Sequence, residues 1–266
     1  MTKPTILLMP GAWHDGSIYN PLAEILRSKG FEAEPITLPS LGVSPTTSAY
    51  DDATFIRDRY LNPLIGEGKE IIIVAHSYAG VPGTECVKGF AKKDLASQGQ
   101  EGGVVGIIYI AASLVPKGWS VERMIGKRLD NLMEMNQDEM MPPKDAEVKF
   151  YNDFDEETRK EYLASITPHA PEAMRTVLTY ESYRDVDSNY IICLNDAGFP
   201  VEGQKMMADM PGEGVIRTYE VDGGHMCMVS RAGDVAGVIF DVAGRVCGSG
   251  TEWVDSSELG EGGSRP

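Results

Sequence analysis

Three side chains that can cooperate in acyl transfer occur in this sequence in the order serine, aspartate, histidine. They are Ser77, Asp196 and His225. A serine hydroxyl is a weak nucleophile at neutral pH, so it needs a base within hydrogen-bond distance to take its proton. An imidazole can be that base, and a carboxylate can fix its tautomer and stabilise its charged form. These residue types predict nucleophilic catalysis, provided that the chain brings them together.

Small residues surround Ser77 in the stretch Ala75-His-Ser-Tyr-Ala-Gly80. Small residues two before and two after a serine are typical of the nucleophile elbow, a strained turn from a strand into a helix. The motif is common by chance, and an ordinary tight turn is the structural alternative. The context favours the elbow, because a β-branched run over 71–74 predicts a buried strand before it and an apolar helical pattern over 81–90 follows.

Asp196 and His225 each follow a predicted strand. Apolar residues 190–194 precede Asp196, and the partly alternating residues 215–221 precede Asp222-Gly-Gly-His225. Ligands of open α/β sheets bind at the carboxyl ends of the strands, so Ser77 and these two residues are expected at one edge. Alternatives stay open: Asp196 could only cap the next helix, Asp222 competes as the acid from the same loop as the histidine, and His225 could be an ordinary loop residue.

The chain has four histidines. His14 and His76 flank the site in sequence, but neither lies where the fold would place a base, so we expect structural or pocket-lining roles for both. His169 follows Thr167-Pro168 and is expected to order a turn or line the pocket.

Strand patterns alternate with helical patterns over the first part of the chain and again near its end. Strands are expected at 6–9, 31–38, 71–74, 104–110, 190–194 and 215–221. The alternation predicts an α/β fold with a mostly parallel, doubly wound sheet and right-handed crossovers.

The alternation stops between residues 116 and 185, where the chain is helical in character and rich in methionine: Met124, Met133, Met135, Met140 and Met141. We expect a helical cap here, inserted into a core made of residues 1–115 and 186–247. The methionines suit a pliable apolar wall, or they fill the cap's own core. The polar, acidic residues 248–266 are expected to form a flexible tail.

Composition limits the classes of function. The 266 residues are 42% hydrophobic, enough for one large domain with a sizeable core, and the net charge of -16 argues against nucleic acid or an anionic membrane as partner. No apolar run of about 18 residues predicts a transmembrane helix, and the run over 6–9 is too short for a signal peptide. The sequence leaves a homodimer open.

Four widely spaced cysteines occur in the chain: Cys86, Cys193, Cys227 and Cys247. We expect them to be reduced, in a cytosolic protein. Neither a Cys-x-x-Cys nor a His-x-x-x-His spacing occurs, so zinc is not expected. We also expect no other metal and no cofactor.

The sequence resembles the α/β-hydrolase superfamily, and most of all its branch with plant methyl esterases, hydroxynitrile lyases and small microbial hydrolases. Four stretches carry the resemblance: Pro10-Gly-Ala-Trp-His14, Ala75-His-Ser-Tyr-Ala-Gly80, Asn195-Asp196 through Pro200, and Val221-Asp-Gly-Gly-His225. The resemblance implies that Ser77 is the nucleophile, His225 the base and Asp196 the acid. It also implies an oxyanion hole formed by the backbone N–H groups of Ala12 and Tyr78.

Two departures separate the branches. Hydroxynitrile lyases of this type carry Thr in the first loop and Lys directly after the histidine, where this chain has Gly11 and Met226. Without the lysine there is no cation to stabilise a cyanide leaving group. Pro10 stands where many relatives carry His, which bears on the geometry of the oxyanion hole.

We therefore expect a serine hydrolase that cleaves an ester, lactone or thioester of an apolar small molecule through an acyl-enzyme. One alternative is a lyase or cyclase of secondary metabolism that uses the same pocket without an acyl-enzyme. The other is a ligand receptor on the same fold.

Overall fold

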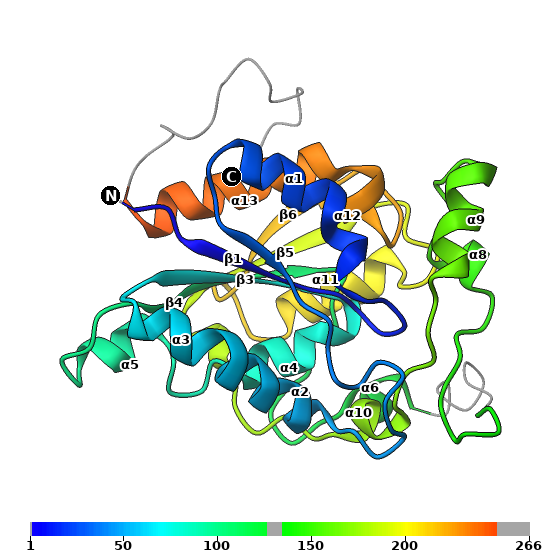
Figure 1. Ribbon diagram of the computed structural model, residues 1–266, viewed down its shortest axis with the longest axis horizontal. Helices are drawn as coiled ribbons and strands as arrows, with labels where there is room; N and C mark the ends of the chain where they lie inside the picture. The colour runs from blue at the N-terminus through cyan, green and yellow to red at the C-terminus, as the bar shows by residue number, and fades with distance from the viewer. Residues whose placement is uncertain (1, 127–134, 249–266) are drawn as a thin grey trace.

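A six-stranded sheet lies at the centre of the computed structural model, which describes residues 2–126 and 135–248 (Figure 1). Its order is β2-β1-β3-β4-β5-β6, and every neighbouring pair is parallel. The strands are β1 (Thr5–Met9), β2 (Ala33–Pro35), β3 (Glu70–His76), β4 (Gly103–Ile110), β5 (Asp187–Cys193) and β6 (Arg217–Val221). The order reverses at β1, which makes the sheet doubly wound.

Helices cover both faces of the sheet. One face carries α1 (Asn20–Ser28), α12 (Cys227–Ser230) and α13 (Ala232–Val246). The other carries α2 (Ala49–Ile56), α3 (Asn62–Gly66), α4 (Gly80–Glu85), α5 (Lys92–Ala96) and α11 (Val201–Asp209), as Figure 1 shows.

The central strands are buried on both faces because their apolar residues are continuous. In β3, Ile72 and Val74 pack in one apolar cluster with α1 and α13, whereas Ile71 and Ile73 pack in a second cluster with α2 and α4. Successive side chains of a strand point to opposite faces, so a continuous apolar run fills two clusters at once.

Two predicted elements are shorter than the sequence pattern indicates. The strand expected over 31–38 is paired only over β2, at the edge of the sheet; Pro35, which has no N–H to donate, is its last residue. The helix expected over 81–90 ends at Glu85, and the chain then turns through Gly89, whose φ is 79°. The apolar pattern of the sequence does not show where tertiary packing ends this strand or this helix.

Residues 111–186, between β4 and β5, form what we call the inserted segment. It contains α6 (Val121–Ile125), α8 (Ala146–Lys149), α9 (Glu156–Ala164) and α10 (Pro171–Arg175). Among the described residues of the segment, these helices have four to nine residues each. Figure 1 shows α8 and α9 beside the carboxyl ends of the strands.

The inserted segment shares the apolar clusters of the sheet. Phe150 and Tyr151 belong to the cluster with α1, and Met140 and Met141 belong to the cluster with α2. These two methionines thus pack against the sheet domain; Met133 lies outside the described residues, as does nearly all of the predicted tail. In the part of the chain that is described, no helix is both long enough and apolar enough to cross a membrane.

Candidate active site

Ser77 occupies the turn from β3 into α4, and its φ of 51° places it in the left-handed region. Residues other than glycine rarely adopt this conformation, so the turn stores backbone strain. Gly80 has no room for a side chain, because a Cβ there would lie 2.6 Å from the carbonyl oxygen of Ser113. The Ser113 N–H in turn donates to the Ser77 carbonyl at 2.9 Å. The small residues of the motif permit this sharp turn.

Two hydrogen bonds join Ser77, His225 and Asp196 in a row. The Ser77 Oγ lies 3.2 Å from His225 Nε2, and His225 Nδ1 lies 2.7 Å from Asp196 Oδ2. Because Nδ1–H donates to the carboxylate, the lone pair of Nε2 faces the serine hydroxyl. Both His225 and Asp196 are buried. The three residues that the sequence singled out are therefore brought together.

Asp196 is held by several donors besides His225. Its Oδ1 accepts from the Gly198 N–H at 2.8 Å and the Phe199 N–H at 2.7 Å. Its Oδ2 also accepts from the side-chain amide of Gln204 at 3.2 Å, and the Gln204 carbonyl accepts from the Cys193 N–H at 2.8 Å. Gln204 is a fully buried polar residue of α11, and its local sequence does not mark it as part of the site. These bonds fix the carboxylate before any substrate binds.

Asp222, the alternative acid, lies elsewhere. It is exposed, and its side chain accepts from the Asn195 side-chain amide at 2.6 Å. No hydrogen bond joins it to His225 in the described residues. The geometry favours Asp196 over Asp222 as the partner of the imidazole.

His14 and His76 hydrogen-bond to backbone groups near the site, and neither is bonded to Ser77 in the described part of the chain. His76 Nδ1 accepts from the Gly11 N–H at 3.2 Å, and its Nε2–H donates to the His225 carbonyl at 3.0 Å. His14 Nδ1–H donates to the Ala12 carbonyl at 2.8 Å. Burial lowers the pKa of His14 to about 4 and the pKa of His76 well below its ordinary value, so both rings are neutral at neutral pH.

The first loop lies directly against Ser77. A Cβ at Gly11 would come within 2.7 Å of the Ser77 Cβ and 2.9 Å of His76 Nδ1, so this position does not accommodate a threonine without a shift. The neighbouring Ala12 N–H makes no hydrogen bond among the described residues. Tyr78 is the second residue of a 3-10 helix (Ser77–Ala79), so its N–H has no partner within that helix.

A buried carboxylate anchors the Tyr78 side chain. The Tyr78 hydroxyl donates to Asp52 Oδ2 at 2.6 Å, and Ser40 donates its N–H at 2.9 Å and its hydroxyl at 2.6 Å to the same carboxylate. Desolvation raises the pKa of Asp52, although these donors oppose the shift. The sequence did not reveal this network, because Asp52 resembles an ordinary polar residue at the start of a helix.

The inserted segment reaches the histidine and acid loops. The Phe150 ring stacks on the His225 ring with centroids 5.4 Å apart. Asp153 Oδ2 accepts from the Gly224 N–H at 2.7 Å, and the Asn152 side chain donates to the Asn195 carbonyl at 2.8 Å. The segment therefore contacts both loops that carry the predicted site residues.

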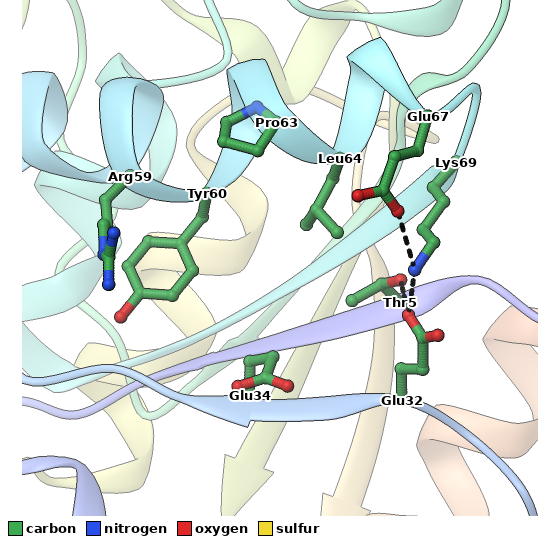
Figure 2. Close-up of a pocket in the computed structure, with 9 residues that line it drawn as sticks. All are labelled: Thr5, Glu32, Glu34, Arg59, Tyr60, Pro63, Leu64, Glu67 and Lys69. Carbon is green, nitrogen blue, oxygen red and sulfur yellow. Dashed lines mark hydrogen bonds and ion pairs between the residues drawn. The ribbon is translucent and has the colours of Figure 1, made fainter.

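Two surface hollows are lined by residues other than Ser77, Asp196 and His225. One of about 310 Å³ lies near the amino ends of β1 and β3, where Lys69 pairs with Glu32 at 2.7 Å and with Glu67 at 3.2 Å (Figure 2). The other, of about 350 Å³, lies between α1 and α9 and is bordered by His14 and Tyr162. The first is at the wrong end of the sheet to take part in chemistry at Ser77, and its lysine is already paired.

A parallel α/β sheet with a serine elbow after β3, and with its acid and histidine after β5 and β6, defines an α/β-hydrolase. The chain belongs to the alpha/beta hydrolase family, whose model matches residues 6–238. It is 28% identical over 249 residues to an alpha/beta hydrolase of Aspergillus novofumigatus, which covers 92% of this chain and 98% of that protein.

Two further proteins are similar to this chain in sequence or in structure. Methylesterase 18 of Arabidopsis thaliana is 30% identical over 139 residues, 51% of this chain and 47% of that protein. A pyrethroid hydrolase from Sphingobium faniae has a similar structure, with a TM-score of 0.72 over 91% of this chain and 98% of the other. At 17% sequence identity, this likeness shows the shared fold.

Proposed function

We propose that the protein is a serine hydrolase that cleaves an ester, lactone or thioester of a small apolar molecule through an acyl-enzyme. The observation that carries the proposal is the row Ser77 Oγ, His225 Nε2, His225 Nδ1 and Asp196 Oδ2, joined by bonds of 3.2 and 2.7 Å. In it the imidazole nitrogen that faces the hydroxyl carries a lone pair, which is the arrangement that general-base catalysis requires.

The row supports a two-stage reaction. The Ser77 Oγ attacks the substrate carbonyl carbon while its proton passes to His225 Nε2, and Asp196 stabilises the resulting imidazolium. The Ala12 and Tyr78 N–H groups donate to the developing oxyanion. The C–O or C–S bond then breaks, and the leaving group takes the proton from Nε2. Water, activated by the same nitrogen, attacks the acyl-enzyme and releases the acid and the free serine.

The surroundings of Ser77 favour an apolar substrate. The Phe150 ring stacks on His225 and on Trp13, with centroids 5.4 and 5.3 Å apart, and Trp13 Nε1–H donates to the carbonyl of Met141 at 2.7 Å. The preference for an ester substrate is supported by the similarity of this chain to a methylesterase of Arabidopsis thaliana.

A fluorophosphonate probe together with a panel of simple esters tests the proposal. We expect the probe to label the wild type and not Ser77→Ala, and ester turnover to be lost in the same variant. Equal labelling of the two proteins would contradict the proposal. Activity that survives Ser77→Ala but is lost in His225→Ala would select the lyase or cyclase alternative, and tight binding with negligible turnover would select a receptor.

We also propose that the protein works in a reducing compartment such as the cytosol. Cys193 and Cys227 are both buried free thiols with their sulfur atoms 3.3 Å apart. Such a pair is compatible with a compartment that keeps thiols reduced. Thiol alkylation of the protein as isolated from its source, followed by mass spectrometry, should show both cysteines reduced; a disulfide between them would contradict this location.

A further inference from the structure

His169 of the inserted segment is held by backbone bonds on two sides. Its N–H donates to the Met141 carbonyl and the Met141 N–H donates to its carbonyl, both at 2.9 Å. It also forms an isolated β-bridge with Leu41. The backbone at His169 is thus fixed between two other stretches of chain, and a side chain on such a support is presented with a defined position.

The imidazole of His169 differs from the other three in the chain. It is 1% exposed, and among the described residues neither Nδ1 nor Nε2 has a hydrogen-bond partner. The rings of His14, His76 and His225 use both nitrogens. A buried polar group without a partner lowers stability, so an imidazole kept in this state calls for an explanation.

The His169 ring lies near one aromatic side chain from each of the two stretches that would form the oxyanion hole. Its centroid is 4.6 Å from that of Tyr78, in an edge-to-face arrangement, and 6.4 Å from that of Trp13. Tyr78 follows Ser77, and Trp13 follows Ala12. His169 thus contacts the side chain of the residue that carries one of the two N–H groups and lies near the ring of the residue that follows the other.

The neighbouring wall is apolar and adaptable. Met141 and His169 form a hydrogen-bonded antiparallel pair, and residues opposite one another in such a pair project their side chains on the same side. Methionine is flexible enough to give way to a ligand. A substrate that displaces the Met141 side chain would reach the imidazole.

We propose that His169 determines specificity by hydrogen-bonding a second oxygen of the substrate, a keto or hydroxyl group close to the scissile carbonyl. The inference rests on the proposed function and narrows its substrate class to oxygenated esters. Burial lowers the pKa of His169 to about 3, so at neutral pH its ring offers one N–H donor and one lone pair. A neutral ring of this kind suits a neutral oxygen better than a carboxylate, whose charge it would not compensate.

Three methyl esters of equal chain length test this role: methyl 3-hydroxyhexanoate, methyl 3-oxohexanoate and methyl hexanoate. The wild type should show a kcat/KM at least about tenfold higher for an oxygenated ester than for methyl hexanoate, a ratio that one hydrogen bond supplies. His169→Phe keeps a flat ring against Tyr78 but has no polar atom. It should lose that preference and hydrolyse methyl hexanoate within about threefold of the wild type.

Two further variants separate recognition from packing. His169→Gln keeps a donor and an acceptor and should restore part of the preference. Met141→Leu changes the same wall without changing its polarity and should alter the three rates alike. In thermal unfolding, His169→Phe should melt at the same temperature as the wild type or higher, because a polar ring without a partner is replaced by an apolar one.

Equal loss on all three esters in His169→Phe, or a wild type without any preference, would overturn the inference. If the protein is not a serine hydrolase, the result differs: no ester is hydrolysed and Ser77 is not labelled. Calorimetric binding of the same esters to Ser77→Ala gives a readout that needs no turnover. There the preference for an oxygenated ester should persist, and it should vanish in the Ser77→Ala, His169→Phe double variant.

Discussion

The strand-end loops and the inserted segment meet at Ser77, but they differ in how far their buried polar groups are hydrogen-bonded. In the loops, Asp196 accepts from two backbone N–H groups and two side chains, and both nitrogens of His225 are bonded. In the inserted segment, both ring nitrogens of His169 and Oδ1 of Asp153 are buried without a partner among the described residues. The polar groups of the loops are thus fixed by partners within the protein, whereas the inserted segment retains hydrogen-bonding capacity that the proposed substrate would use.

Of the substitutions predicted below, the one that removes the charge of Asp196 should reduce activity most. Asp196→Asn should lower kcat by about 10³–10⁴-fold, because an amide no longer fixes the imidazole tautomer or stabilises the imidazolium. Steady-state ester hydrolysis measures the loss. Asp222→Asn is the matched control and should stay within about twofold of the wild type. A larger loss in Asp222→Asn than in Asp196→Asn would assign the acid to the other loop.

A methyl group at Gly11 tests how tightly the first loop must lie against Ser77. Gly11→Ala places a Cβ within 2.7 Å of the Ser77 Cβ, and we expect kcat/KM to fall roughly 10- to 100-fold as the loop shifts. Gly233→Ala is the control, because a Cβ there meets nothing within 4 Å in α13. Unchanged activity in Gly11→Ala would show that the loop position is not critical.

Asp153 tests whether the inserted segment also supports the chemistry. Asp153→Ala removes the acceptor of the Gly224 N–H and of the Ser230 hydroxyl, both at 2.7 Å, and frees the loop that carries His225. We expect kcat to fall about fivefold, equivalent to roughly 1 kcal/mol in the barrier. Asp155→Ala, which removes the N-cap of α9 and leaves that loop alone, should cost stability but not kcat. Equal effects of the two variants would mean that Asp153 acts through general stability.

From the buried histidines we expect a smaller effect, which is a change in how the free energy of unfolding depends on pH. Burial lowers the pKa values of His14 and His169 to about 4 and about 3 from an ordinary 6.5, so below pH 6.5 the unfolded chain binds protons that the folded chain does not. Their contribution to stability is complete above pH 6.5 and is lost as the pH falls towards these folded values. Between pH 6 and 4, His169→Phe should reduce the slope of unfolding free energy against pH by about 1.4 kcal/mol per pH unit. Urea unfolding at several pH values measures it; identical slopes would mean that the native ring is already protonated.

Local sequence was sufficient to predict the sheet and to single out three residues that the fold brings together. The apolar runs in β1, β3 and β4 are buried on both faces, and a short continuous apolar run is typical of such a strand. The small residues around Ser77 are required by its left-handed φ and by the approach of Ser113 to Gly80. These signals lie within a few residues of the feature that they predict.

The parts that the sequence did not reveal depend on contacts between distant stretches. Gln204 and Asp52 look like ordinary polar positions of helices, and only the fold brings them to Asp196 and Tyr78. The backbone position of His169 depends on two β-bridges, one with Leu41 and one with Met141. No local periodicity encodes such pairings, because their partners are selected by tertiary packing.

Mass spectrometry of the protein during turnover tests the central claim most directly. If the hydroxyl at position 77 is the nucleophile, rapid acid quenching of a reaction with a slowly hydrolysed ester should show a protein heavier by one acyl group, with the added mass on the peptide that contains Ser77. Turnover of the same ester with the Ser77 peptide unmodified, and with Ser77→Ala equally active, would contradict the account.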